Sequence, residues 1–127
     1  MKYVVGFFAV LMMGCSPEKE KSIVGKWMMH QVVQNGQDVT SEHNPEADRY
    51  AIFNADSTFE SGGRPYGKNT GTYSINKKGN RIYIFSDAGE NDNSQWLFEV
   101  HGDTMIWDGF GSEWADGFRL VHVRDQE

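Results

Sequence analysis

Hydrophobic and polar residues alternate along most of the chain from Gly25 onward, and no long stretch has the 3.6-residue period of an amphipathic helix. The alternation is clearest in Gln95–His101, where Trp96, Phe98 and Val100 share one face. Glycine, asparagine and aspartate separate the alternating segments, as is typical of strands joined by turns. The pattern predicts an all-β fold with eight strands, at Lys26–Gln34, Arg49–Phe53, Thr58–Gly62, Gly71–Asn76, Arg81–Ser86, Gln95–His101, Thr104–Asp108 and Phe118–Arg124.

Two of these strands have an ambiguous pattern. Arg81–Ser86 is apolar on both faces over Ile82 to Phe85, so the alternation cannot orient it. In the last strand, Phe118 and Leu120 are out of phase with the pair formed by Val121 and Val123. We expect a β-bulge in the last strand, because one extra residue would bring these side chains onto a common face.

The connections between the predicted strands alternate in length. Tight hairpin turns are expected at Asn54–Ser57, Lys77–Asn80 and Gly102–Asp103. Longer links lie between them, at Asn35–Asp48, Gly63–Thr70, Asp87–Ser94 and Gly109–Gly117. In an antiparallel up-and-down meander every other connection falls at the same end, which predicts a short-turn end and a long-loop end. Closing the eight strands into a barrel removes the exposed sheet edges.

The interior of such a barrel has room for its own side chains or for one small ligand. Most of the side chains predicted to point inward are aromatic, and each can bury about 150–250 Å². We therefore expect a small or largely filled interior, with a shallow pocket near the long-loop end. Tyr73, Trp96 and Trp107 are the candidate ligand-binding residues, because their polar atoms can orient a ligand while their rings cover it; simple core packing is the alternative. The predicted inward residues are Trp27, Met29, Phe53, Phe59, Tyr73, Ile75, Ile84, Trp96, Phe98, Val100, Met105, Trp107, Phe118 and Leu120.

Gly25-Lys26-Trp27 opens the first predicted strand, and an arginine lies in the last one. With the meander and the segments Phe53–Phe59 and Gly71–Ile75, these residues resemble the small lipocalin-like (calycin) domains of bacterial lipoproteins. The resemblance covers about Val24 to Arg124 and implies that Gly25, Trp27 and Arg124 close the barrel floor, with the arginine over the indole. The turn before Thr104 lacks the Thr-Asp-Tyr signature of larger lipocalins, and the domain is shorter, so a large cavity is not expected.

The N-terminal segment predicts export and a lipid anchor. The apolar run Tyr3–Met13 follows Lys2, and it is shorter than the roughly 20 residues that a membrane-spanning helix needs. Leu11–Cys15 resembles the lipobox of bacterial lipoproteins, which implies cleavage before Cys15 and acylation of that residue. The alternative is an incidental thiol in an ordinary signal peptide. We expect a signal peptide at 1–14, a lipidated cysteine and tether at 15–23, and a domain at 24–127. The lipid would anchor the domain in the bacterial envelope. Ser16 follows the cysteine where the resemblance associates an aspartate with inner-membrane retention, which favours the outer membrane.

The charge balance limits the partners. The 127-residue sequence has 12 Lys and Arg against 18 Asp and Glu, a net charge of −6, and without a basic cluster it is unlikely to bind nucleic acid. Acidic residues concentrate in the predicted long loops, where Arg64 and Lys68 are the chief cations, so these loops would attract a cationic ligand or a basic protein surface. The acidic residues are Asp38, Glu42, Glu46, Asp48, Asp87, Glu90, Asp92, Asp108, Glu113 and Asp116.

Evidence for catalysis or cofactors is weak. The four histidines show no paired spacing, and no Ser-His-Asp or phosphate-binding pattern is present. Asp87–Asn93 offers oxygen ligands suited to calcium without the EF-hand spacing, and a solvated loop explains it better. The segment Phe110–Trp114 has two interpretations, a lid over the barrel mouth or a protein contact. We expect no catalytic residues, no metal site and no cofactor.

Two hypotheses for the function follow. The first is a membrane-anchored lipocalin-like lipoprotein that binds a small, partly apolar ligand at the long-loop end. The second is a non-enzymatic interaction, accessory or inhibitor module that acts through its acidic loops.

Overall fold

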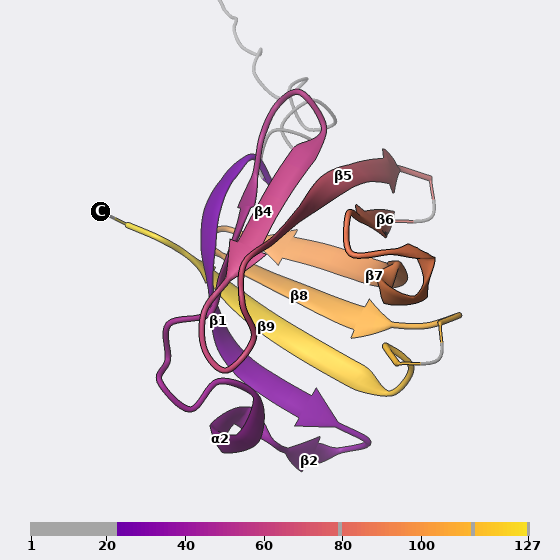
Figure 1. Cartoon of the computed structure of the whole chain (residues 1–127). Helices are drawn as coiled ribbons and strands as arrows, with labels where there is room; N and C mark the ends of the chain where they lie inside the picture. Colours follow the sequence, from indigo (N-terminus) through magenta and orange to yellow (C-terminus); the bar gives the residue numbers. More distant parts are fainter. Residues whose placement is uncertain (1–22, 79, 113, 127) are drawn as a thin grey trace, which may run out of the picture.

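The computed structural model describes residues 23–78, 80–112 and 114–126 (Figure 1). The predicted signal peptide, Cys15 and residues 16–22 of the predicted tether lie outside these residues. In chain order the elements are β1 (Gly25–Gln34), β2 (Gln37–Asp38), α2 (Thr40–His43), β3 (Tyr50–Phe53), β4 (Thr58–Gly62), β5 (Asn69–Asn76), β6 (Arg81–Ser86), η3 (Glu90–Asp92), β7 (Ser94–His101), β8 (Thr104–Gly109) and β9 (Phe118–Arg124).

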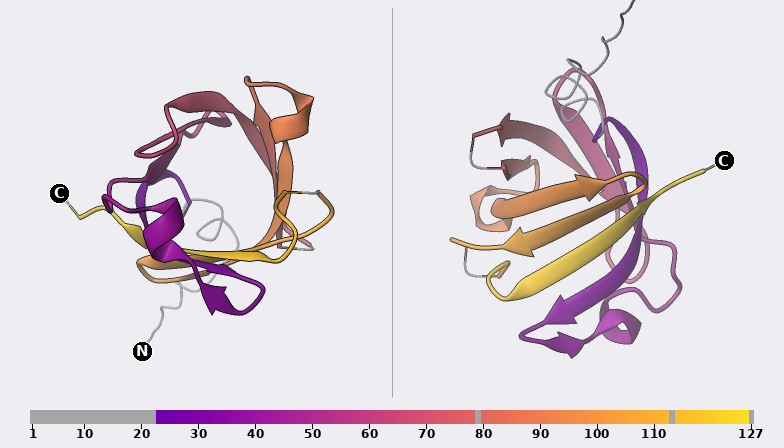
Figure 2. Two further views of the ribbon diagram at one scale, coloured as in Figure 1. Left: turned by 60° about the horizontal axis from the view of Figure 1, so that its bottom comes forward. Right: turned by 180° about the vertical axis from the view of Figure 1, so that it is seen from behind.

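The long strands form one closed antiparallel barrel. Each strand from β3 to β9 pairs with its neighbour in sequence, β1 pairs with β3, and β1 also pairs with β9, which closes the sheet. Figure 2 (left) shows the resulting ring of strands. The two-residue β2 folds back against the end of β1 as a small appendage. The predicted all-β, eight-stranded antiparallel meander barrel is therefore confirmed.

The connections separate by length as the alternation of the strands requires. Asn54–Ser57, Lys77–Asn80 and Gly102–Asp103 fall at the short-turn end, while α2, η3 and the β4–β5 and β8–β9 loops fall at the long-loop end. Each short turn contains a residue with positive φ, at Ser57, Asn80 and Gly102. Such residues allow the tight reversal that a hairpin needs.

The β-bulge lies in the first strand, so the bulge expected in the last strand is wrong. Met29 pairs with His122 and Gln31 pairs with Val121, which leaves His30 as the extra residue in β1. The bulge reverses the facing of β1. Val32 is buried like Trp27, although it lies an odd number of positions, five, along the strand from Trp27. Strand β9 runs without interruption and turns Phe118, Leu120 and a buried histidine, His122, inward.

The core fills the short-turn end of the barrel and continues along β7 and β8 towards the long-loop end. It contains Ile23, Trp27, Phe53, Phe98 and Met105, together with further aromatic and aliphatic residues from all sides. Ile23 is buried, so the packed domain begins within the segment predicted to be tether. The ambiguous strand β6 is also resolved: Ile82 is fully buried in the core, whereas the neighbouring Phe85 is exposed on the outer surface.

An arginine and a tryptophan close the short-turn end. The Trp27 side chain is 0% exposed, and its Nε1 donates a hydrogen bond to the carbonyl oxygen of Ile23 at 3.0 Å. The guanidinium carbon of Arg124 lies 4.2 Å from the centroid of the Trp27 ring. Gly25 has φ of +129°, a conformation that favours glycine, and a Cβ there would lie 3.0 Å from Arg124 Nη1, so the guanidinium would have to shift slightly. No helix in the described part of the chain is long and apolar enough to cross a membrane.

Candidate ligand-binding cavity

A cavity of about 480 Å³ occupies the half of the barrel nearest the long-loop end. Small-molecule sites in proteins typically measure about 300–1,000 Å³. Its walls come from the inner faces of β1, β3, β4, β6, β7, β8 and β9, and residues of the long loops line its rim. The inward side chains of β3 and β4 are small here, because Ala51 pairs with Ser61. This gap makes the cavity larger than the shallow pocket that the aromatic content predicts.

A continuous row of contacting aromatic rings lines the cavity from its mouth to its floor. Trp114 contacts Trp96 with ring centroids 5.9 Å apart, Trp96 contacts Trp107 at 5.4 Å, and Trp107 contacts Phe53 at 5.7 Å. The row leads from the β8–β9 loop at the mouth to the packed core. It offers a ligand an extended apolar surface with preferred tilted and edge-to-face contacts.

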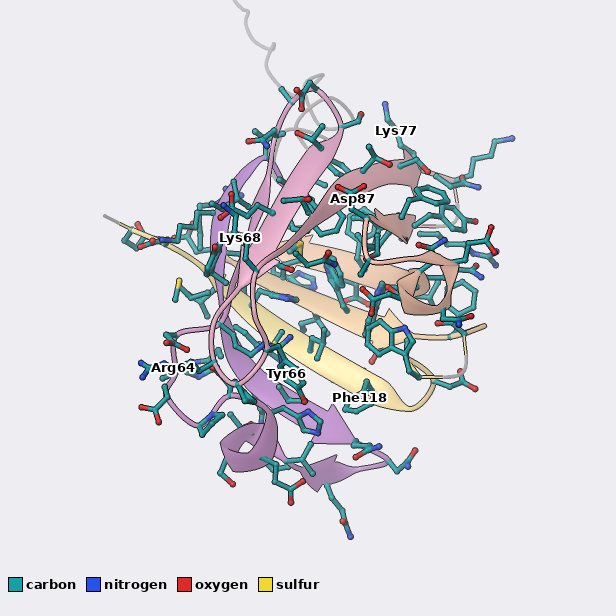
Figure 3. The ribbon with its side chains drawn as sticks, viewed as in Figure 1. Arg64, Tyr66, Lys68, Lys77, Asp87 and Phe118 are labelled. Carbon is teal, nitrogen blue, oxygen red and sulfur yellow. The ribbon has the colours of Figure 1, made fainter. Side chains whose placement is uncertain are left out.

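Side chains from three separate segments cover part of the mouth. His43 of α2 lies 2.8 Å from the hydroxyl of Tyr66 through Nδ1, and its ring meets Phe118 edge-on at 5.4 Å. Tyr66 is 47% exposed. Figure 3 shows Tyr66 and Phe118 at this end of the barrel, with Arg64 on the outer side of the same β4–β5 loop. The contacts join α2, the β4–β5 loop and the start of β9.

Arg49 is a cation within the cavity wall. Its Nη1 donates a hydrogen bond to the carbonyl oxygen of His43 at 3.1 Å, and its guanidinium carbon lies 4.7 Å from the centroid of the Tyr66 ring. Burial lowers the pKa of Arg49 from its ordinary value. Asp92 is the acidic residue among the described lining residues, and its Oδ2 accepts hydrogen bonds from Ser86 Oγ and Asn69 Nδ2.

Comparison with known proteins agrees with this architecture. The sequence profile of the lipocalin-like domain family matches residues 23–107, which is more than half of the chain. The chain belongs to the lipocalin-like domain family. A solved structure of a DUF4847 family protein from Bacteroides vulgatus is similar in fold, with a TM-score of 0.59, 13% sequence identity, and coverage of 87% of this chain and 99% of that chain. A search of curated proteins found no match.

The lipocalin-like cavity brings together two of the three predicted ligand-binding residues. Trp96 and Trp107 line it, and Trp96 Nε1 donates a hydrogen bond to Ser94 Oγ at 2.7 Å. Tyr73 is not among the lining residues, because its side chain packs towards the short-turn end and its hydroxyl donates to the carbonyl oxygen of Asn54 at 2.8 Å. Two lining residues, Arg49 and His122, are not among the ligand-binding residues predicted from the sequence. The pattern of residues predicts Arg49 only as the first residue of a strand.

Two polar atoms in the cavity wall have no hydrogen-bond partner within the described residues. They are Nε1 of Trp107 and Nδ1 of His122. The two rings lie 5.1 Å apart, and the His122 side chain is 2% exposed. Burial, more than any other cause, lowers the pKa of His122 from 6.5 to about 4, so the imidazole is neutral at pH 7. An unpaired buried polar atom is uncommon, and because neither atom has accessible surface, both lie behind the cavity surface and not on it.

The acidic loops outside the cavity have more partners than the sequence suggests. Asp48 accepts from Arg64 Nε at 2.9 Å, and hydrogen bonding to that guanidinium lowers the pKa of the Asp48 carboxyl. Asp108 pairs with Arg119 at 2.7 Å, and Asp87 accepts from the hydroxyl of Thr70. Over the described residues, no group of three or more His, Cys, Asp and Glu side chains is placed to hold a metal ion.

The two aromatic residues of the β8–β9 loop lie in different surroundings. Trp114 lines the cavity and is 45% exposed at the mouth. Phe110 lies outside the lining, where the Arg81 guanidinium is 5.2 Å from its ring centroid. A lid role therefore has structural support for Trp114 alone.

Proposed function

We propose that this lipocalin-like domain binds a small, partly apolar molecule in the cavity at the long-loop end. The observation that supports the proposal is the aromatic row from Trp114 through Trp96 and Trp107 to Phe53, which lines a cavity of about 480 Å³ open to one side. An apolar ligand there leaves water for a preformed surface, which is the main source of affinity in such sites. The proposal assigns no catalytic role to any residue.

The test uses an uncharged fluorescent probe and a matched pair of variants. N-phenyl-1-naphthylamine brightens in apolar surroundings, so titration with the purified domain measures its dissociation constant. Ser61 lines the cavity, whereas Ser74 on β5 is exposed on the outer surface. We expect Ser61→Trp to weaken probe binding at least tenfold, because the indole fills the cavity, and Ser74→Trp to leave binding unchanged.

The outcomes separate cavity binding from surface adsorption. Failure of the probe to bind the unmodified domain, or equal loss in both variants, would contradict the proposal. Native mass spectrometry of protein purified from its own host then identifies what the cavity holds. Capture of a protein partner at the acidic loops, with an empty cavity, would support the interaction module instead.

We further propose that acylated Cys15 anchors the domain in the bacterial envelope, at the outer membrane, with the cavity mouth turned away from the lipid. The proposal is supported by the lipobox-like segment Leu11–Cys15 and by the position of the first described residues. Ile23 contacts Trp27 at the short-turn end, and Gly25 pairs with Phe53 at that same end.

Substitution of the cysteine tests the anchor. We expect Cys15→Ala to move the protein from the membrane fraction to the soluble fraction while its thermal unfolding temperature stays the same, because the packed residues that the structure describes begin at Ile23. Ser16→Ala is the control and should stay with the membrane. A Cys15→Ala protein that remains membrane-bound would show that another segment holds it.

A further inference from the structure

One row across three adjacent strands places a cation and the buried histidine on the same wall of the cavity. The backbone N–H of Met29 on β1 bonds to the carbonyl oxygen of Arg49 at 3.0 Å, and on its other side Met29 pairs with His122 of β9. All three residues line the cavity. Because neighbouring strands lie about 4.8 Å apart, the row places Arg49 and His122 two strand spacings apart on one wall, on either side of Met29. The charge of Arg49 also lowers the pKa of His122.

The Arg49 guanidinium has no ionic partner in this position. No carboxylate of residues 23–78, 80–112 or 114–126 forms an ion pair with it, and one hydrogen bond to the His43 carbonyl engages a single N–H. The Arg64 guanidinium, at the same end of the barrel, is paired with Asp48 and Glu46 and faces outward. A guanidinium has five N–H donors in a planar fork, and withdrawing it from water without a counter-charge is unfavourable.

The described lining of the cavity does not supply a free counter-charge for this guanidinium. Asp92 is the acidic side chain among the described lining residues, and its Oδ2 accepts from Ser86 and Asn69. A ligand oxygen that carries negative charge suits the unused N–H donors of Arg49, since charge-assisted hydrogen bonds are stronger than neutral ones.

We propose that Arg49 is the head-group subsite of the cavity and that the ligand is an apolar molecule carrying one carboxylate or similar monoanionic group. The inference rests on the proposed function, since it assigns the chemistry of the ligand in the same cavity. The anion lies against Arg49, and the apolar body lies along the aromatic row. The cationic ligand suggested by the acidic loops does not suit this interior, because Asp92 is already hydrogen-bonded to Ser86 and Asn69.

The first experiment compares two ligands that differ in the charged group alone. Decanoate and 1-decanol are used to displace N-phenyl-1-naphthylamine from the unmodified domain at neutral pH. We expect decanoate to displace the probe at a concentration at least tenfold lower. The net charge of −6 disfavours general adsorption of anions, so such a preference must come from a local site. Equal displacement by the two ligands overturns the anion subsite while the probe titration still supports an apolar cavity.

The second experiment removes the charge at two matched positions. Arg49→Gln should raise the decanoate concentration that displaces the probe to the concentration that 1-decanol requires. The 1-decanol concentration itself should not change. Arg64→Gln removes an outward-facing guanidinium at the same end of the barrel and should change neither. Arg49→Lys keeps the charge without the planar fork and should retain part of the preference. Loss of decanoate preference in Arg64→Gln, or its persistence in Arg49→Gln, contradicts the proposal.

A third comparison identifies the source of the carboxylate. Displacement by 1-naphthoate is measured beside decanoate, with 1-naphthalenemethanol as the uncharged control. Stronger displacement by decanoate indicates a lipid-derived acid, and stronger displacement by 1-naphthoate indicates an aromatic acid. Either result supports a monoanion subsite, whereas a failure of both acids to exceed their alcohols overturns it.

Discussion

An arginine lies over an aromatic ring at each end of the barrel. At the short-turn end, Arg124 lies 4.2 Å from the Trp27 ring centroid, and its Nε is 3.7 Å from the carboxylate of Asp103. At the long-loop end, Arg49 lies 4.7 Å from the Tyr66 ring centroid, and among the described residues no carboxylate pairs with it. Both guanidinium groups also donate to a main-chain carbonyl oxygen.

The difference between the two pairs lies in their surroundings. Trp27 is fully buried against the core, so the Arg124 pair completes the packing of the barrel floor. Tyr66 is about half exposed beside a cavity, and the Arg49 pair leaves donors and space unused. The same kind of contact therefore contributes to stability at Arg124, where the ring is buried and a carboxylate pairs with the guanidinium. At Arg49, where the carboxylate is missing among the described residues, the guanidinium can still bind a ligand.

The largest expected effect comes from truncating the ring at the closed end. Trp27→Ala should lower the free energy of unfolding by about 3–5 kcal/mol, because it leaves a cavity under Arg124 in a fully packed site. Trp114→Ala at the open end removes a ring that is 45% exposed and should cost less than half as much. Urea denaturation of both variants measures the contrast, and equal losses would mean that the two ends do not differ in packing.

The pH dependence of stability tests the histidine that lies between the two ends. His122 has a pKa of about 4 in the folded protein against 6.5 when exposed, with the Trp107 ring, the Met105 backbone and the charge of Arg49 around it. Between these values the unfolded chain binds a proton that the folded chain does not, so stability falls as the pH drops from 6.5 towards 4. The full loss is about 3 kcal/mol.

Two histidine variants isolate this contribution. Urea denaturation between pH 7 and 4.5 should show that His122→Gln flattens the fall in stability, while His30→Gln, at an exposed position, keeps the slope of the unmodified protein. Titration of the carboxylates is common to all three proteins and cancels in the comparison. An identical slope in His122→Gln would show that the buried imidazole gains its proton without loss of stability.

The barrel could be predicted from the sequence because its strands depend on local alternation. Trp96 and Phe98 in β7 show the period directly, and the lengths of the links determine which loops share an end. The alternation failed at His30, where one extra residue in β1 reverses the inward face and buries Val32. Nothing in the residue types around His30 marks the bulge, since it is set by pairing with the distant strand β9.

The cavity could be predicted less well, for two physical reasons. Its volume depends on two small inward residues, Ala51 and Ser61. The prediction of a largely filled interior rests on the large aromatic side chains and does not include these two. Its charge depends on Arg49, whose contacts come from α2 and the β4–β5 loop. Those contacts exist only after the loops have folded over the mouth, so local patterns in the sequence do not contain them.

The smallest effect gives the sharpest form of the comparison, because the same substitution is made at both arginines. Arg124→Met should lower the free energy of unfolding by about 1–2 kcal/mol, since it removes a cation from a buried indole together with its ion pair. Arg49→Met should change it by no more than about 0.5 kcal/mol, because the methionine gains apolar contacts and removes an unpaired charge, which offsets the loss of one hydrogen bond and of the cation–π contact with the half-exposed Tyr66. Chemical denaturation without added ligand measures both values. If Arg49→Met is as destabilising as Arg124→Met, the Arg49 pair is a structural element of the mouth, and the distinction between the two ends fails at this contact.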